Sequence, residues 1–285
     1  MPTAGDVLRD AEATLKASGA VDHHPYKEAS EAADLLTFVL GEAPDDVDEV
    51  APGALRRFRR LVARRAAGEP VGYITGRTEF RGLTLAVGPG AFIPRSSSEF
   101  MAEQAIRRLR SRRRPAHVDL ACGVGPVALA VAAEAPGTEV VGVDLSARPV
   151  AFARRNARAL GLANVRFLRG DLFNPLPASL RGSVDVVTIH PPYVGRREVR
   201  TLPDEIRRFE PVESLTDRSP RGLGLIERAA TESSSWLKAG GWLLVEVSSD
   251  RSRAVKSLLH RAGLVDVRST KGELSVSRVV LGRRS

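Results

Sequence analysis

The 285-residue chain lacks several features that would indicate a membrane-bound or secreted protein. It has one cysteine, Cys122, so no disulfide can form within the chain, and a reducing cytoplasm is the predicted location. No run of about 18 apolar residues occurs, so we expect no membrane span. Residues 1–6 show no basic region leading into an apolar stretch, which argues against a secretory signal.

Lysine is scarce too, since only five of the 43 basic residues are Lys. Residues 1–85 hold 11 basic and 14 acidic side chains, whereas the remainder holds 32 and 20, so the positive charge lies in the later part of the chain. A basic face favours a polyanionic partner such as RNA, which would fit a protein that works near the ribosome. Arginine spread along the whole chain is equally typical of solvated side chains in a biased composition.

The patterning predicts two domains joined by a hairpin. Residues 1–77 carry apolar positions at helical spacing, interrupted by glycine and proline, and predict a small helical domain. Residues 78–95 alternate apolar and polar positions and predict a β-hairpin linker. Residues 96–285 begin with a helix near 97–110 and continue as the larger domain, with no internal repeat.

The larger domain alternates strands with helices. Strands are expected at 116–121, 139–143, 165–168, 184–189 and 241–247, and a terminal strand pair at 264–281. Helices are expected at 126–134, 147–160, 222–238 and 250–262. This alternation predicts an α/β fold with a doubly wound, mostly parallel sheet of the Rossmann-like type.

A glycine-rich turn follows the first of these strands, in the order Asp119-Leu-Ala-Cys-Gly-Val-Gly125. Glycines at such a turn let the backbone approach a ligand closely. Asp144 ends the next strand, where a carboxylate accepts hydrogen bonds from ribose hydroxyls, and Asp171 follows the third, within reach of an adenine amine. The predicted cofactor-binding residues are Asp119, Ala121, Cys122, Gly123, Val124, Gly125, Asp144, Leu145, Asp171, Leu172 and His190.

Three interpretations of this turn stay open. The spacing Gly123-x-Gly125-x-x-Ala128 also fits a dinucleotide site, and a short glycine turn can be purely structural. Asp119, four residues before the first glycine, favours S-adenosylmethionine, and nothing downstream offers hydride chemistry. Cys122 has no evident base partner, so we expect a small filler rather than a nucleophile.

The second motif is His190-Pro191-Pro192-Tyr193, at the carboxyl end of the fourth predicted strand. Two successive prolines fix the backbone and aim their carbonyls. Methyl transfer to an amide nitrogen is helped when a side-chain acceptor and the first proline carbonyl bind its two N–H groups, while Tyr193 stacks on the flat acceptor. We therefore predict these four residues as catalytic, and an ordinary strand-ending turn is the alternative.

These motifs together resemble the protein-(glutamine-N5) methyltransferases that modify peptide-chain release factors. The resemblance spans nearly the whole chain and rests on segments including Glu69-Pro-Val-Gly-Tyr-Ile-Thr-Gly, Phe92-Ile-Pro-Arg95, Phe209-Glu210-Pro211 and Gly240-Gly-Trp-Leu-Leu-Val-Glu246. It implies S-adenosylmethionine as cofactor, a helical domain that docks the release factor, and methylation of the glutamine in a Gly-Gly-Gln loop. Arg95 and Glu210 are the candidate substrate-binding residues.

The chain departs from the family pattern at several positions. His190 stands where the family has Asn, and Ser96, Ala121-Cys122, Ser248 and Arg251 replace other family residues. Neutral imidazole offers one acceptor and one donor, whereas imidazolium offers donors only. His190 is therefore a general base, a substitute amide acceptor or a structural residue.

Alternative functions remain open at this point. They are a nucleic-acid base amino-methyltransferase, a small-molecule tailoring methyltransferase with His190 as base, and a protein that binds S-adenosylmethionine without catalysis. The oligomeric state is open, and a monomer is favoured. We expect no metal, because no grouping of ligands has metal-site spacing. His23 and His24 are expected at the surface of a loop in the helical domain.

Overall fold

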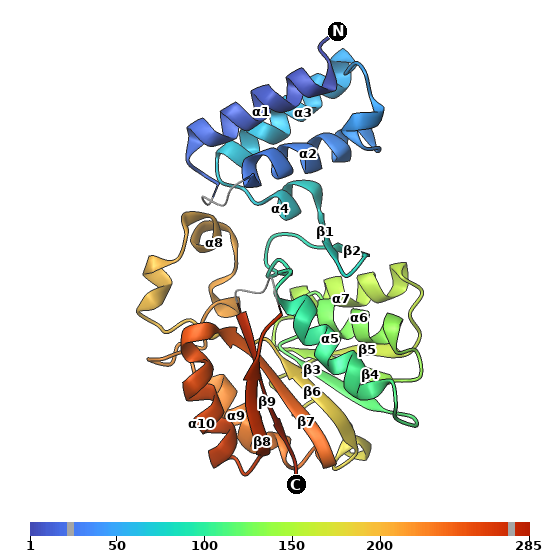
Figure 1. Ribbon diagram of the computed structural model, residues 1–285, viewed down its shortest axis with the longest axis vertical. Coiled ribbons are helices and arrows are strands. Elements are labelled where there is room, and N and C mark those ends of the chain that lie inside the picture. Colours follow the sequence, from blue (N-terminus) through green and yellow to red (C-terminus); the bar gives the residue numbers. More distant parts are fainter. Residues whose placement is uncertain (22–25, 273–276) are drawn as a thin grey trace. The chain divides into compact units, whose positions relative to one another are not determined.

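The computed structural model describes residues 1–21, 26–272 and 277–285, and the chain forms two compact units (Figure 1). His23 and His24 lie outside the described residues. The first unit comprises Met1–Arg77 and Arg200–Glu210, and the second comprises Thr78–Val199 and Pro211–Ser285. The division made from the sequence assigned residues 200–210 to the larger domain, whereas the contacts group them with the helical unit.

The first unit is a small helical bundle. Its helices are α1 (Ala4–Ser18), α2 (Lys27–Leu40), α3 (Pro52–Ala66), α4 (Val71–Thr75) and, from the later segment, α8 (Asp204–Phe209), with a 3₁₀ turn at Pro44–Asp46. Leu15, Leu35 and Phe58 are buried in the centre of the bundle. Arg65 of α3 is buried as well and forms ion pairs with Glu31 of α2 and Glu205 of α8. These pairs explain why residues 200–210 belong to this unit.

The second unit begins with the predicted hairpin. Its strands β1 (Arg77–Phe80) and β2 (Leu83–Ala86) form a two-stranded sheet. Asn156 holds β2 in place, because its side chain accepts from the Ala86 N–H and donates to the Ala86 and Val124 carbonyls. The hairpin is thereby tied to the glycine-rich turn.

The main sheet has seven strands in the order β5-β4-β3-β6-β7-β9-β8. The strands are β3 (Ala116–Leu120), β4 (Glu139–Asp144), β5 (Val165–Arg169), β6 (Val184–Ile189), β7 (Leu237–Ser248), β8 (Val265–Thr270) and β9 (Ser277–Arg283). The first five strands in this order, from β5 through β4, β3 and β6 to β7, are parallel. Strands β9 and β8 form the antiparallel edge. The α/β fold with a doubly wound, mostly parallel sheet is confirmed.

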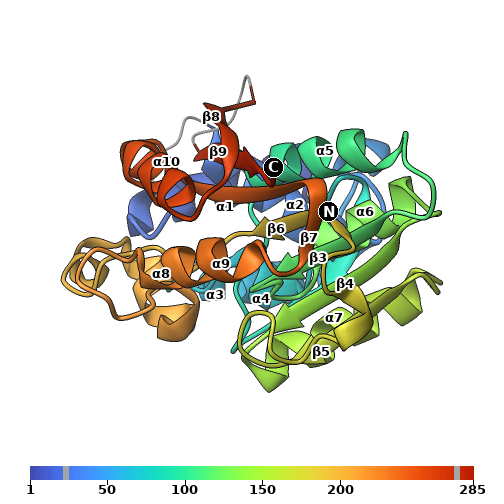
Figure 2. The same cartoon turned by 90° about the horizontal axis from the view of Figure 1, so that it is seen from below.

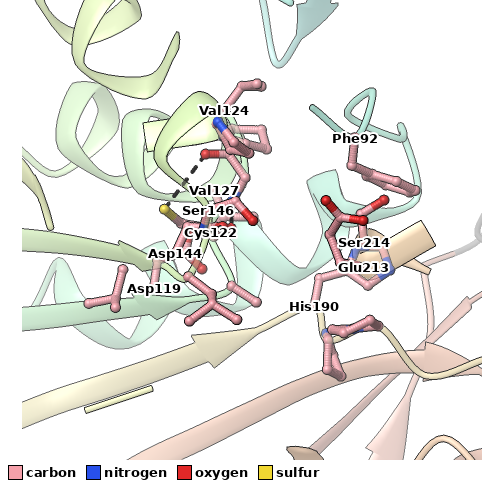
Figure 3. A pocket seen from close by; sticks show the side chains of 18 of the residues that line it. Phe92, Asp119, Cys122, Val124, Val127, Asp144, Ser146, His190, Glu213 and Ser214 are labelled. Atoms are coloured by element: carbon pink, nitrogen blue, oxygen red, sulfur yellow. Dashed lines mark hydrogen bonds between the residues drawn. The ribbon is translucent and has the colours of Figure 1, made fainter. Parts of the chain in front are cut away.

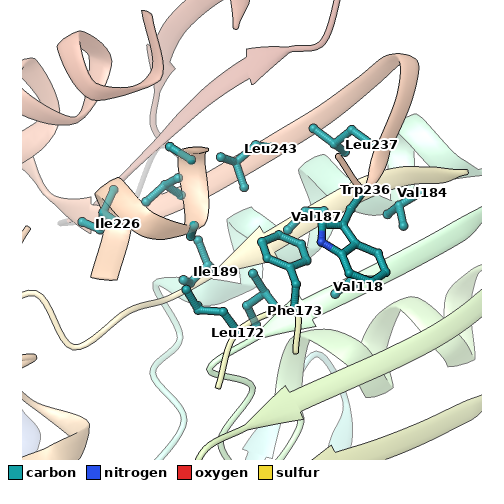
Figure 4. Close-up of a cluster of buried hydrophobic side chains, with 14 of the residues drawn as sticks. Val118, Leu172, Phe173, Val184, Val187, Ile189, Ile226, Trp236, Leu237 and Leu243 are labelled. Carbon is teal, nitrogen blue, oxygen red and sulfur yellow. The ribbon is translucent and has the colours of Figure 1, made fainter. Parts of the chain in front are cut away.

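Helices cover both faces of this sheet (Figure 2). One core lies between the sheet and α5 (Ser98–Leu109), α6 (Pro126–Glu134) and α7 (Ala147–Ala159), and the other between the sheet and α9 (Gly224–Ser233) and α10 (Ser252–Arg261). The second core includes the stacked rings of Phe173 and Trp236, whose centroids are 5.6 Å apart (Figure 4).

One predicted helix was too long. The expected helix at 222–238 ends at Ser233, because the chain then joins the sheet, where Leu237 pairs with Val184. Sheet pairing at this point overrides the helical spacing of the apolar residues. No helix among the described ranges combines the length and apolarity needed to cross a membrane.

Candidate functional site

A pocket that is open to solvent lies at the carboxyl ends of the central strands. Strand order reverses between β3 and β6, and ligands of open α/β sheets bind at such a switch point. The residues following β3, β4, β5 and β6 all contribute to its wall, together with parts of 90–101 and 211–214. Figure 3 shows the glycine-rich turn on one side, and Phe92, His190, Glu213 and Ser214 on the other.

Asp144 organises the turn after β3. Its Oδ2 accepts from the Gly123 N–H and its Oδ1 from the Ser146 N–H, both at 2.9 Å. Burial raises the pKa of this carboxyl, and the two backbone hydrogen bonds oppose that effect. Ala121 and Gly123 both have left-handed backbone, with φ of 50° and 55°, a conformation that is strained for alanine and characteristic of functional loops.

Phe167 explains two of the glycines near this turn. A Cβ at Gly142 would lie 2.4 Å from the Phe167 ring, and one at Gly125 would lie 2.8 Å from it. Gly125 therefore serves to admit the ring and to adopt its φ of 89°, and it is not among the residues that line the pocket. Cys122 lines the pocket, and burial raises the pKa of its thiol, so it is a poor nucleophile as the sequence indicated.

A buried polar chain lies beneath the turn. Thr188 donates to Asp119 Oδ1 at 2.7 Å, and its oxygen lies 2.9 Å from His117 Nε2, which therefore carries the proton. The Ala128 N–H donates to Asp119 Oδ2. Burial raises the pKa of Asp119 to about 7 despite these donors, and it lowers the pKa of His117 to about 3. His117 is thus a neutral support of the site rather than an acid or base.

The rim next to Asp144 suits an adenosine group. Leu145 lines the pocket and is 64% exposed, so its side chain is available for contact with a flat apolar ligand. Leu172 and Asp171 line the same region. Asp171 also pairs with Arg228 of α9 at 2.7 Å, a partner that the sequence did not predict.

His190 lies where β6 ends, in contact with two other elements. Its Nδ1 lies 3.1 Å from the Ser98 hydroxyl of α5 and 3.8 Å from Glu246 Oε2 of β7. Glu246 is fully buried, and its Oε1 accepts hydrogen bonds from Ser97 and Ser277. Its Oε2 has no hydrogen-bond partner among the described residues.

Aromatic rings enclose the His190 imidazole. Tyr193 stacks on it with centroids 5.8 Å apart, and Phe92 meets it edge-on at 5.9 Å. Arg95, which lines the pocket as well, holds its guanidinium 4.6 Å from the centre of the Phe92 ring. Tyr193 itself does not line the pocket, because its ring covers His190.

The two prolines of this motif differ in their carbonyls. The Pro192 carbonyl accepts from the Asp217 N–H at 3.2 Å. The Pro191 carbonyl has no hydrogen bond within the described part of the chain, so it is the one available to a ligand. Both prolines line the pocket beside His190.

Most predicted site residues meet in this pocket. The lining includes Arg95, Asp119, Ala121, Cys122, Gly123, Val124, Asp144, Leu145, Asp171, Leu172, His190, Pro191 and Pro192. Glu210 is buried within the helical unit and is not among them, since α8 carries it into that unit. Sequence reasoning did not identify Ser98, His117, Glu213 or Glu246 as parts of the site. A single carboxylate within the apolar stretch Trp242-Leu-Leu-Val-Glu-Val247 was a usable signal for Glu246.

Known proteins resemble both parts of the chain. Residues 6–76 match the PrmC N-terminal domain, and residues 118–209 match a family described as methyltransferase domain. A release factor glutamine methyltransferase of Bordetella pertussis is 37% identical, covering 87% of this chain and 92% of the relative. One from Xylella fastidiosa (strain 9a5c) is 36% identical, covering 86% of each.

A solved structure shares the fold. The T. thermophilus 16S rRNA N2 G1207 methyltransferase, in complex with AdoMet and guanosine, matches with a TM-score of 0.52 and 19% identity. The match covers 73% of this chain and 50% of that one. At this identity the likeness shows the fold alone.

Proposed function

Since the chain belongs to the release factor glutamine methyltransferase family, we propose that it methylates the side-chain amide nitrogen of a glutamine in a peptide-chain release factor. It is an S-adenosylmethionine-dependent methyltransferase. The single observation that carries the proposal is that residues of both motifs, Ala121 and Gly123 from one and His190 and Pro191 from the other, line one pocket.

The cofactor would lie against the turns after β3, β4 and β5. Asp144 would accept hydrogen bonds from the ribose hydroxyls, Leu145 and Leu172 would enclose the adenine, and Asp171 would accept from its amine. Bound there, S-adenosylmethionine supplies a methyl group on a sulfonium sulfur that leaves as a neutral thioether. The exposed leucine beside a buried carboxylate supports this arrangement.

The acceptor amide would lie at the carboxyl end of β6. The Pro191 carbonyl would accept one amide N–H, and His190 would take the second, which keeps the nitrogen lone pair available for the methyl carbon. The rigid double proline and the rings of Phe92 and Tyr193 would hold these acceptors in place.

The helical unit would dock the release factor, a role supported by its match to the PrmC N-terminal domain. Glu210, at the end of the segment that joins this unit, would shape the connection to the pocket residues Glu213 and Ser214 rather than touch the glutamine. We further propose that the protein acts as a monomer in the cytoplasm, close to the ribosome. The positive charge of the later part of the chain supports such a location.

Mass spectrometry of the acceptor tests this function. A release factor purified without methylation is incubated with S-adenosylmethionine and the full-length protein, and its Gly-Gly-Gln peptide is analysed. We expect one added methyl group on that glutamine, and none on a release factor whose glutamine is replaced by alanine. Cofactor binding without methylation of the glutamine would reject the proposal and turn attention to RNA and small-molecule acceptors.

A further inference from the structure

We propose that Glu246 and Ser98 hold the His190 imidazole with its proton on Nδ1, so that Nε2 takes up the proton released when the acceptor nitrogen is methylated. His190 then serves as the catalytic base, and Glu246 and Ser98 are positioning residues. This inference rests on the proposed function and extends it to the fate of the proton.

Strand register brings the three side chains together. Thr188 of β6 pairs with Leu244 of β7 in the parallel ladder. Because side chains alternate between the faces of a sheet, His190 and Glu246, each two residues further on, leave the sheet on the same face. Helix α5 packs on that face and presents Ser98 at its first position.

The carboxylate of Glu246 is buried, and no Lys or Arg among the described residues forms an ion pair with it. Its side chain is fully buried, its Oε1 accepts from Ser97 and Ser277, and its Oε2 has no hydrogen-bond partner among the residues described. A buried polar atom left without a partner is costly and rarely retained without a purpose. Here that atom faces His190 Nδ1 at 3.8 Å, a distance for electrostatic attraction rather than a hydrogen bond.

This charge decides the tautomer of His190. The Ser98 hydroxyl, 3.1 Å from Nδ1, can either donate or accept and does not choose by itself. A carboxylate oxygen beside Nδ1 favours the form in which Nδ1 carries the proton and Ser98 accepts it. Nε2 has no hydrogen bond to any described residue, so its lone pair is free to face a ligand in the pocket.

Methyl transfer leaves a surplus proton on the acceptor nitrogen, and the lone pair on Nε2 of His190 can take up that proton. The glutamine nitrogen forms a bond to the methyl carbon, the carbon–sulfur bond breaks with its electron pair on sulfur, and the surplus proton on nitrogen passes to Nε2. The imidazolium that results is stabilised by Glu246, in the manner in which a buried carboxylate supports the histidine of a hydrolytic triad. A carboxamide at this position could accept a hydrogen bond but could not take the proton.

Other charged groups around the imidazole are compatible with this role. Arg95 lies over Phe92 rather than on the ring of His190, and burial raises the pKa of Tyr193, which keeps its phenol neutral. Glu213 lines the same pocket, and Asp250 and Arg251 act on Tyr193 with opposite signs. Among the described residues, Glu246 is the carboxylate that lies within ion-pair distance of Nδ1, at 3.8 Å.

The first arm of the test is histidine ¹⁵N NMR of the full-length protein. Glu246→Gln keeps the acceptor for Ser97 and Ser277 and replaces Oε2 with an amide that donates to Nδ1. We expect unprotonated Nε2 on His190 in the wild type and protonated Nε2 in Glu246→Gln. His190→Asn assigns the signal, and His117, whose proton lies on Nε2, is an unchanged internal reference. Protonated Nε2 in the wild type, or no change in Glu246→Gln, would overturn the proposal.

The second arm measures the single-turnover rate of glutamine methylation against pH, with saturating cofactor. The wild type should lose activity on acidification, because a proton on Nε2 removes the base. In Glu246→Gln we expect a rate lower by roughly tenfold or more at neutral pH and a displaced acid limb, with unchanged cofactor affinity. His190→Asn should lose the acid limb, and exposed His260→Asn should behave as the wild type.

Two controls separate the possible failures. Ser98→Ala should lower the rate by a few-fold and Ser98→Thr should restore it, which tests positioning even where Glu246→Gln folds poorly. A wild type that folds and binds cofactor but methylates no glutamine would reject the proposed function, while the NMR arm still decides the tautomer. Identical pH profiles for wild type and Glu246→Gln would overturn the inference and leave the proposed function standing.

Discussion

The protein contains two buried ionic clusters that differ in how their charges are compensated. In the helical unit, the buried guanidinium of Arg65 lies 2.7 Å from both Glu31 and Glu205. In the larger unit, the equally buried carboxylate of Glu246 has two serine hydroxyls on one oxygen and, within the described part of the chain, a histidine near the other. The first cluster pairs its charges and fastens three helices together. The second leaves a charge unpaired beside a reactive ring, an arrangement typical of functional sites.

The comparison teaches that burial alone does not reveal the role of a charge. Removing one member of a paired cluster leaves an uncompensated charge and costs folding free energy. Removing an unpaired charge relieves the fold and should instead cost activity. Arg65→Met and Glu246→Gln test this contrast directly, and Asp144→Ala and His117→Gln extend it to two other buried groups of the larger unit.

The largest effect is expected from Arg65→Met. The substitution leaves the half-buried Glu31 and Glu205 with Lys27, 3.9 Å from each, as their remaining cation among the described residues, and we expect a loss of up to about 3–5 kcal/mol in the stability of the helical unit. Hydrogen exchange of the amides in α2 and α3, measured at increasing urea concentrations, gives this loss of stability. Arg64→Met is the matched control, because Arg64 forms a more exposed pair with Glu69 and should lose less than about 1 kcal/mol. Equal losses in the two variants would show that the buried cluster does not stabilise the unit.

Asp144→Ala should affect the pocket without unfolding it. The carboxylate fixes the Gly123 and Ser146 N–H groups and is the proposed partner of the ribose. Losing hydrogen bonds to a charged group costs about 1.5–3 kcal/mol, so the Kd for S-adenosylmethionine should rise roughly 10- to 100-fold. Isothermal titration calorimetry measures this change, with Glu139→Ala, which removes an exposed carboxylate at the opposite end of β4, as a control. A Kd within threefold of the wild type would contradict the placement.

His117 should make the larger unit sensitive to acid. The pKa of His117 is about 3 in the folded chain and roughly 6.5 in the unfolded chain. Between these two pH values the unfolded chain therefore binds a proton at His117 that the folded chain does not bind. Stability should therefore fall as pH drops from about 6.5 towards 3, by at most about 1.4 kcal/mol per pH unit. His117→Gln should lack this slope in urea unfolding at matched pH. Both proteins keep Asp119, so the difference isolates His117, and parallel slopes would refute the linkage.

The smallest change in stability, and the sharpest test of the contrast, is expected from Glu246→Gln. Neutralising an unpaired buried carboxylate should alter the unfolding free energy by less than about 1 kcal/mol or raise it, while methylation slows. Glu31→Gln makes the same substitution in the paired cluster and should destabilise the helical unit, because Arg65 then loses a compensating charge. Similar stability losses in both variants would remove the distinction between the clusters.

Local pattern was enough for much of the fold. Helix α6 and strand β6 have the bounds expected from their apolar runs, since neither segment needs a distant partner to define its period. Helix α9 ends before the predicted residue 238, because Leu237 belongs to β7 and pairs with Val184 of β6. Helix α8 was not expected, because six residues carry little periodic signal. The assignment of 200–210 to the helical unit depends on ion pairs with residues more than a hundred positions away.

The candidate site divides in the same way. Gly123, Asp144 and His190 follow strands, so strand endings predicted that they would meet. Gly125 and Tyr193 stay predictions as cofactor-binding and catalytic residues, and the packed structure places Phe167 against the first and His190 against the second.

The sequence by itself determined the α/β class, the two motifs and the family, because these depend on local period and on the chemistry of short segments. Only the tertiary structure decided that Ser98 and Glu246 meet His190, residues separated by 92 and 56 positions. Such meetings are set by strand register and helix packing, and a one-residue shift in the register of β6 or β7 would turn the side chain to the opposite face of the sheet. The environment of a catalytic group is therefore a property of the folded chain, whereas its identity is written in the sequence.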